Sequence, residues 1–268
     1  MTKVLNWGMT PGMGDVMLAM NCAHRWSYEN KQPLILNLHW FHGKDHLHHP
    51  EDPETIVERT DYILGLYLKA DIQVNHIFNS DQYHLKETYK RYDWLNPRTN
   101  RNTNNWIFDP ATSLAADENK VVIWRPIFNS EISKLWKRRV ENEYWDELIY
   151  FLKLTGYDVV ELCYRTPIRE ATYHINTCNF IICYDGMWHY IAKNFLKPMI
   201  VSSQDSITKY HTRHCLALSA EKFRRLTNDL FIPLYHSEYY NGIFSYYDLI
   251  HQKSKKHKQK FWNRYNAN

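Results

Sequence analysis

Two short glycine-containing segments carry the side chains that could do chemistry. In the first, Gly12-Met13-Gly14-Asp15, an apolar run precedes the glycines and an amphipathic pattern follows them. The second, Asp185-Gly186 followed by His189, stands between an apolar run and another helical pattern. A turn from a strand into a helix presents unpaired N–H groups and the positive helix end, which suit a phosphate. Both segments are therefore predicted to bind a ligand, and the turn at Asp185-Gly186 is predicted to bind one that carries a phosphate.

Each of these residues also has a purely structural interpretation, which stays open. Asp15 could cap the helix that it opens, since Asp is favoured at that position. Asp185 could likewise only cap the second helix, and His189 could be a satisfied core histidine. Gly186 could serve only the turn.

The surrounding pattern predicts alternating strands and helices. Residues 4–7 read as a strand, Asp15 opens a helix, and residues 33–38 form a second strand. A helix from Pro53 to about residue 70 and a strand over 72–78 follow. This βαβ order places the glycine loop at the carboxyl end of the first strand, where open α/β sheets bind ligands.

The second half repeats this alternation. Strands are predicted at 121–124, 157–162, 180–183 and 199–201, and helices at 144–154, 167–175, after Gly186 and from Ser219. Polar, loop-like stretches over 96–119 mark a domain boundary. We predict an N-terminal domain over 1–110, a second over 111–235, and a basic helical tail over 236–268.

Charge is unevenly distributed along the chain. The formal net charge is +4, yet residues 249–268 alone hold six Lys and Arg residues and no acid. The rest of the chain is slightly acidic, which argues against a general nucleic-acid-binding protein. The five cysteines form no CxxC pair, and no apolar stretch is long enough to span a bilayer. These features predict a soluble, intracellular protein with reduced thiols.

A histidine-rich loop covers residues 39–53 (HWFHGKDHLHHPEDP). Its histidines and Asp45 could supply zinc ligands, but no HExxH motif is present and no cysteine lies nearby. We predict an exposed loop and no metal site.

Three segments resemble a known family. The stretch Asn179–Val201 (NFIICYDGMWHYIAKNFLKPMIV) is similar to the donor-site segment of GT-B-fold glycosyltransferases, in particular the ADP-heptose:lipopolysaccharide heptosyltransferases. Members of that family read as a strand, Asp-Ser/Thr-Gly-x-x-His, an Ala-rich helix, Gly-Lys-Pro and a strand. Residues 8–19 (GMTPGMGDVMLA) resemble the family's glycine-rich loop, and Lys134-Leu135-Trp136 resembles its Lys-x-Trp. The segments occur in the family's order.

The resemblance implies an α/β fold with two Rossmann-like, GT-B-like lobes, mainly parallel sheets and a C-terminal helical tail. Residues 1–110 would be the acceptor side and residues 111–235 the nucleotide-sugar-binding lobe. The enzyme would transfer a sugar from a nucleotide-diphosphate donor to a hydroxyl, with inversion, without cofactor or metal. The acceptor could be a glycan, a lipid-linked group or a nucleic-acid-linked group, and the basic tail could touch an anionic surface. The protein would be cytoplasmic, or peripheral to a membrane.

The resemblance also implies the roles of individual residues. Asp15 would be the general base that takes the acceptor's proton. The donor would be bound by Gly12, Gly14, Arg125, Lys134, Asp185, Gly186 and His189. Positive charge from Lys134 and Arg125 would neutralise the leaving diphosphate, although Lys134 could equally belong to a solvated basic face.

Two rival functions remain. The spacing from Asp185 to His189 is one residue shorter than in the family, and the N-terminal domain is short. These departures suggest a non-catalytic protein that binds nucleotide sugars or glycans. A methyltransferase or NAD enzyme is disfavoured, because no full GxGxxG motif is present and no acid follows the second strand.

Overall fold

A computed structural model describes residues 2–9, 13–40, 53–67, 71–78, 108–125, 140–163, 165–184, 186–202 and 215–227. The chain divides into two compact units. Unit 1 comprises Met1–Ser113 and Gly186–Phe195, and unit 2 comprises Leu114–Asp185 and Leu196–Asn268. The short segment Gly186–Phe195 therefore lies in unit 1, although its neighbours in the sequence on both sides belong to unit 2. The sequence gives no sign of this exchange, and the predicted tail over 236–268 lies outside the described residues.

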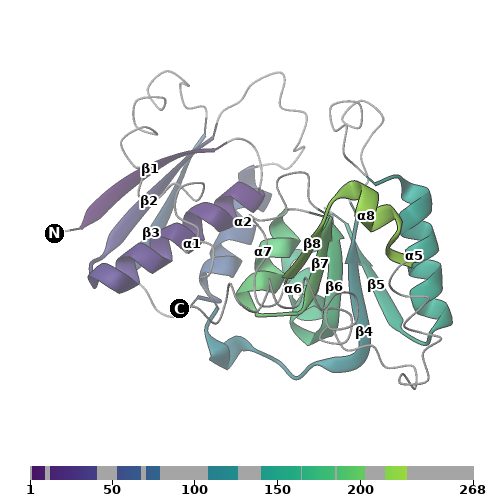
Figure 1. The fold of residues 1–268 in the computed structure, drawn as a ribbon. Coiled ribbons are helices and arrows are strands. Elements are labelled where there is room, and N and C mark those ends of the chain that lie inside the picture. The colour runs from purple at the N-terminus through teal and green to yellow at the C-terminus, as the bar shows by residue number, and fades with distance from the viewer. Residues whose placement is uncertain are drawn as a thin grey trace, which may run out of the picture. The chain divides into compact units, whose positions relative to one another are not determined.

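The sheet of unit 1 contains three parallel strands in the order β1-β2-β3 (Figure 1). These strands are β1 (Lys3–Met9), β2 (Leu34–Trp40) and β3 (Ile72–Ile77). Helix α1 (Met13–Asn30) connects β1 to β2, and α2 (Pro53–Leu64) connects β2 to β3. Side chains of β2 alternate between buried and half-buried, because successive residues of a strand point to opposite faces. One face of the sheet therefore forms the core under α1.

The other face of this sheet carries a row of amides. Asn6, Asn37 and Asn75 are in register on the three strands. Asn75 donates its side-chain N–H to Asn37, which donates in turn to Asn6, each at 3.0 Å. His39 also contacts Asn6 Oδ1 through Nε2 at 2.9 Å. These bonds satisfy polar groups that would otherwise destabilise a half-buried sheet face.

The sheet of unit 2 contains five parallel strands in the order β5-β4-β6-β7-β8 (Figure 1). They are β4 (Asp117–Trp124), β5 (Asp158–Leu162), β6 (Cys178–Tyr184), β7 (Met199–Ser202) and β8 (Cys215–Leu218). Helices α5 (Asn142–Leu154) and α8 (Ala220–Arg224) share one core with β4, β6 and β7. Helix α6 (Ile168–Thr177) contacts β4 and β6. The α/β class and the parallel sheets agree with the prediction.

Several predicted boundaries were wrong. Helix α1 begins at Met13, two residues before Asp15, and α2 ends at Leu64 rather than near residue 70. Strand β4 begins at Asp117, before the apolar part of the strand. Strand β8 was not predicted at all. Most of the histidine-rich loop lies outside the described residues.

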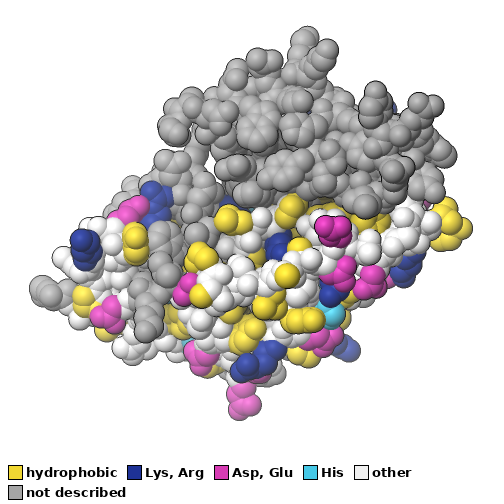
Figure 2. Space-filling view, turned by 90° about the horizontal axis from the view of Figure 1, so that it is seen from below, with side chains coloured by type: hydrophobic (Ala, Val, Ile, Leu, Met, Phe, Trp, Pro, Cys, Tyr) yellow, Lys and Arg dark blue, Asp and Glu magenta, His cyan; other side chains and the backbone are white. Residues whose placement is uncertain are grey.

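The surface of the described residues mixes both signs of charge. On the face drawn in Figure 2, Lys and Arg side chains lie among Asp and Glu side chains rather than in a separate patch. Within the described ranges, no helix combines the length and the hydropathy that a bilayer crossing requires. All five cysteines lie in these ranges, and none of them forms a disulfide.

Candidate functional site

Helix α7 (Met187–Asn194) packs against α1 within unit 1. The two helices approach closely at their N-termini. A Cβ placed on Gly14 would lie 3.5 Å from both the Cα and the carbonyl carbon of Gly186, and 3.6 Å from the Met187 nitrogen. Both glycines are partly exposed, whereas Met13 and Met187 are buried. The structure thus brings together Gly14 and Gly186, two residues of the predicted site.

This arrangement places the positive ends of two helices side by side at a partly exposed point. The N-cap of α7 is Gly186, whose backbone is extended and which has no side chain to bind the first N–H groups of the helix. Asp185 precedes Gly186 in the chain and lies outside the described residues, so its capping of α7 stays a prediction. Because Gly186 has no side chain that could cap them, the first backbone N–H groups of α7 are suitable donors for an anionic ligand.

Asp15 occupies the third position of α1, directly after Gly14. It therefore lies inside the first helical turn, so the interpretation of Asp15 as the N-cap is wrong. A carboxylate at this position is stabilised by the helix dipole. Gly12, Lys134 and Asp185 lie outside the described residues, as does the side chain of Asp15, so their predicted roles stay predictions.

His189 is buried within unit 1, with 1% of its surface exposed. Burial, together with the nearby charge of Lys193, lowers its pKa from 6.5 to about 3. The imidazole is consequently neutral at physiological pH. Such a group can donate one hydrogen bond and accept another, but it cannot supply the positive charge that a phosphate attracts.

Three polar side chains that the sequence did not single out lie between α1 and the C-terminal end of α7. Asn21 and Asn194 exchange side-chain hydrogen bonds at 3.2 and 2.8 Å. The Tyr67 hydroxyl donates to Asn21 Oδ1 at 2.5 Å. All three residues are buried. Their only signal in the sequence is that each asparagine interrupts an apolar helix pattern.

The sheet of unit 2 has its own candidate ligand edge. Its chain order reverses between β4 and β6, and open α/β sheets bind ligands outside the carboxyl ends of the strands at such a switch point. Trp124 ends β4 and Tyr184 ends β6, and their rings meet edge to face with centroids 6.5 Å apart. Ser202 ends β7 and is buried, with no hydrogen-bond partner for its hydroxyl among the described residues.

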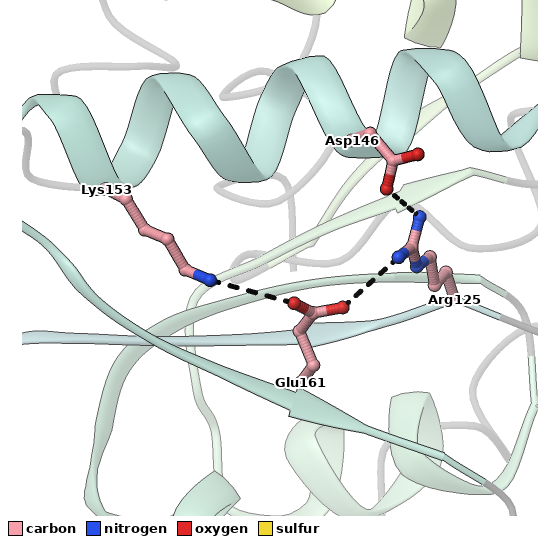
Figure 3. A network of polar contacts seen from close by, with 4 residues as sticks. All are labelled: Arg125, Asp146, Lys153 and Glu161. Carbon is pink, nitrogen blue, oxygen red and sulfur yellow. Dashed lines mark hydrogen bonds and ion pairs between the residues drawn. The ribbon is translucent and has the colours of Figure 1, made fainter.

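Arg125 follows β4 at this edge and is held by two carboxylates (Figure 3). Its guanidinium bonds Asp146 of α5 at 2.5 Å and Glu161 of β5 at 3.4 Å. Lys153 lies 3.9 Å from the other oxygen of Glu161. The guanidinium predicted to bind donor phosphate is therefore already neutralised by protein carboxylates in this structure, and a phosphate would compete with them.

No group of three or more metal-ligating side chains gathers in the part of the chain that the structure describes. His39, the first histidine of the histidine-rich loop, is held by Asn6. The other histidines of that loop lie outside the described ranges.

Comparison with known proteins supports a fold rather than a family. No protein-family model matches the chain, and no curated protein matches it in sequence. The iron-containing dodecameric glycosyltransferase TibC from enterotoxigenic E. coli H10407 superimposes with a TM-score of 0.51 at 14% identity, over 81% of this chain and 62% of that chain. The chain thus spans less than two thirds of the length of TibC.

Two further structures are weaker matches. TibC in complex with ADP-D-β-D-heptose gives a TM-score of 0.46 at 12% identity, over 81% of this chain and 61% of that one. The E. coli heptosyltransferase WaaC with ADP-2-deoxy-2-fluoro heptose gives 0.43 at 13% identity, over 87% and 99%. Of these three structures, the first has a TM-score above 0.5. At the level of the fold, the predicted resemblance to a glycosyltransferase is confirmed by the match to TibC.

Proposed function

We propose that the protein is a glycosyltransferase that moves a sugar from a nucleotide-diphosphate donor to a hydroxyl acceptor. The observation that carries the proposal is the close approach of Gly14 and Gly186, which sets the N-termini of α1 and α7 beside each other. Asp15, in the first turn of α1, is next to Gly14 in the chain. The fold likeness to TibC, a glycosyltransferase whose complex contains ADP-heptose, supports the same class of reaction.

In the proposed reaction the acceptor hydroxyl attacks the anomeric carbon of the donor sugar. The carboxylate of Asp15 takes the hydroxyl proton as the new C–O bond forms. The bond to the diphosphate breaks, its electron pair stays on the departing phosphate oxygen, and the anomeric configuration inverts. Base assistance of this kind contributes on the order of 10²–10⁴ in rate.

The leaving diphosphate gains negative charge, so groups that bind it more tightly in the transition state accelerate the reaction. The first N–H groups of α7, after Gly186, are suited to this task, and Lys134 and Arg125 would add charge. Gly12, Gly14 and Asp185 would line the donor site. His189, neutral because it is buried, would act through a hydrogen bond.

The first test is ligand binding. Calorimetry with ADP, GDP, UDP and CDP and with the corresponding nucleotide sugars, ADP-heptose included, should identify at least one ligand. Hydrolysis or transfer of that donor should then fall by on the order of 10²–10⁴ in Asp15→Asn, while donor affinity stays near that of the wild type. Donor turnover in Asp15→Asn at the wild-type rate would eliminate the proposed base.

The same titration separates the proposal from its rival. Tight binding of a nucleotide sugar without turnover, with a range of glycan and lipid-linked acceptors, would favour a non-catalytic binding protein. The absence of any nucleotide binding would reject both functions.

Metal independence is tested in the same assay. We propose that the reaction needs no divalent ion, because backbone N–H groups and side-chain cations stabilise the leaving group. Turnover should therefore survive dialysis against EDTA, with the metal content of the protein measured before and after. A loss of turnover that iron or zinc restores would overturn this part of the proposal.

A further inference from the structure

We propose that Asn21, Tyr67 and Asn194 are positioning residues that hold the turn at Gly186 against Gly14. The inference rests on the proposed function, because the turn is the part of the site that would bind the donor diphosphate. It concerns unit 1 alone, since α7, α1 and Tyr67 all belong to that unit.

Asn194 is the last residue of α7 and is bonded through both its side chain and its backbone. Its side-chain N–H groups reach Asn21 Oδ1 at 2.8 Å and the Tyr67 hydroxyl at 3.3 Å. Its Oδ1 accepts from Asn21 at 3.2 Å. Its main-chain carbonyl accepts from the Phe108 N–H at 2.9 Å. The C-terminal end of α7 is thus tied to α1 and to two further segments of unit 1.

Tyr67 is itself held in place by its neighbours. The ring of His24 stacks on the ring of Tyr67, with centroids 3.9 Å apart and an interplanar angle of 10°. Phe108 meets the same ring edge to face at 4.9 Å and pairs with Tyr67 in an antiparallel bridge. Burial raises the pKa of Tyr67 well above its usual value, so the hydroxyl keeps its proton and donates it. The phenol is therefore a fixed donor to Asn21.

This cluster and the turn lie at opposite ends of one short, rigid helix. Helix α7 has eight residues, which corresponds to about 12 Å. Its N-terminal end lies close to Gly14, and its C-terminal end carries Asn194. A buried amide pair permits only one relative placement of its partners, because any slip leaves polar groups unsatisfied. A shift at Asn194 would therefore move Gly186 away from Gly14.

Tyr67→Phe and Asn21→Leu test the inference. The first variant removes a single hydroxyl and keeps the ring, and the second removes the partner of both other residues. Thr60→Ala is the matched control, because Thr60 is also buried in unit 1 and, within the described ranges, its side chain bonds only the Ile56 carbonyl of its own helix, at 2.8 Å. Each variant is studied by hydrogen exchange and mass spectrometry, and by calorimetric titration with ADP, GDP, UDP and CDP.

We expect faster exchange over residues 186–195 in Tyr67→Phe and Asn21→Leu, with residues 178–184 of β6 unchanged. The affinity for the nucleoside diphosphate that binds the wild type should fall between about 5- and 150-fold, the range typical of coupled sites. In Thr60→Ala, exchange over 186–195 and nucleotide affinity should match the wild type even where the melting temperature falls.

Exchange over 186–195 that stays at the wild-type rate in both cluster variants would overturn the inference, as would an unchanged nucleotide affinity. If Thr60→Ala loosens residues 186–195 equally, the effect is general destabilisation and the inference is also overturned. If no diphosphate binds the wild type, the proposed function is rejected, and so is the inferred effect of the cluster on diphosphate affinity. The exchange measurement still decides whether the cluster holds the turn.

Discussion

The backbone of Gly186 would lie in ordinary van der Waals contact with a methyl group on Gly14, at 3.5 Å. Alanine therefore fits at Gly14, and its higher helix propensity favours the helix. Compared with alanine, valine at this position adds two further methyl groups, which must displace the turn before α7. We expect Gly14→Ala to retain nucleoside diphosphate affinity and Gly14→Val to lose it, as measured by calorimetry. Equal affinities in the two variants would show that the contact does not shape the site.

The ion pairs of Arg125 predict that two substitutions change the affinity for a nucleoside diphosphate in opposite directions. Arg125→Gln should weaken binding of a nucleoside diphosphate without affecting the nucleoside, because the guanidinium would meet phosphate. Glu161→Gln should strengthen it, because one competing carboxylate is removed. Asp146 and Glu161 are 63% and 40% exposed, so the free energy of unfolding should change by less than about 1 kcal/mol in either variant. Weaker binding in Glu161→Gln would assign Arg125 a structural role.

Two buried histidines make stability depend on pH. Burial lowers the pKa of both His24 and His189 from 6.5 to about 3. Between pH 3 and pH 6.5 the unfolded chain therefore binds more protons than the folded chain. The folded state is thus most stable above pH 6.5, and its free energy of unfolding falls as the pH falls toward 3. Between pH 7 and pH 5 each histidine should remove about 2 kcal/mol from the free energy of unfolding.

His24→Phe tests this dependence, because it keeps a ring stacked on Tyr67 and removes the titrating group. From pH 7 to pH 5, the free energy of unfolding measured with urea should fall by about 2 kcal/mol less in His24→Phe than in the wild type. The same loss in both proteins would mean that His24 is accessible to protons in the folded state.

The backbone conformation at two helix ends predicts that substitutions there change the free energy of unfolding in opposite directions. Lys31, exposed after α1, has φ of +50°, and Gly156, exposed after α5, has φ of +92°. Only glycine adopts this region without steric cost, which is roughly 1–2 kcal/mol for other residues. Lys31→Gly should raise the free energy of unfolding and Gly156→Ala should lower it, each by about 1 kcal/mol, in chemical denaturation. Changes of the same sign would contradict this account.

Strand and helix periodicity predicted most of the fold. Apolar runs such as Phe180–Cys183 gave the buried strands, and Ser219 marked the start of α8, where its side chain accepts from the Lys222 N–H. Boundaries were less certain, because β4 begins with the polar residues Asp117–Asn119, which only pairing with β6 makes part of a strand. Strand β8 has four residues, too few for a recognisable alternation.

The candidate site was only partly predictable. Gly14 and Gly186 were recognised because glycine turns before helices have a local signature, and the structure brings them together. The pairing of Asn21 with Asn194 was not predictable, because it joins residues 173 positions apart and depends on how α7 packs. Nothing local to either asparagine distinguishes a buried network from a surface amide.

Helix α7 belongs to unit 1, although the chain on both sides of it belongs to unit 2, and this limits how the protein can be cut into fragments. A fragment over 114–268 would carry α7, with its buried Trp188 and Ile191, but would lack α1 and Tyr67. A fragment over 1–113 would have Asn21 and Tyr67 without Asn194. Each fragment would thus expose apolar surface that the other fragment covers in the intact protein. We therefore expect each fragment to aggregate when produced alone, and the two to associate into a soluble complex when produced together.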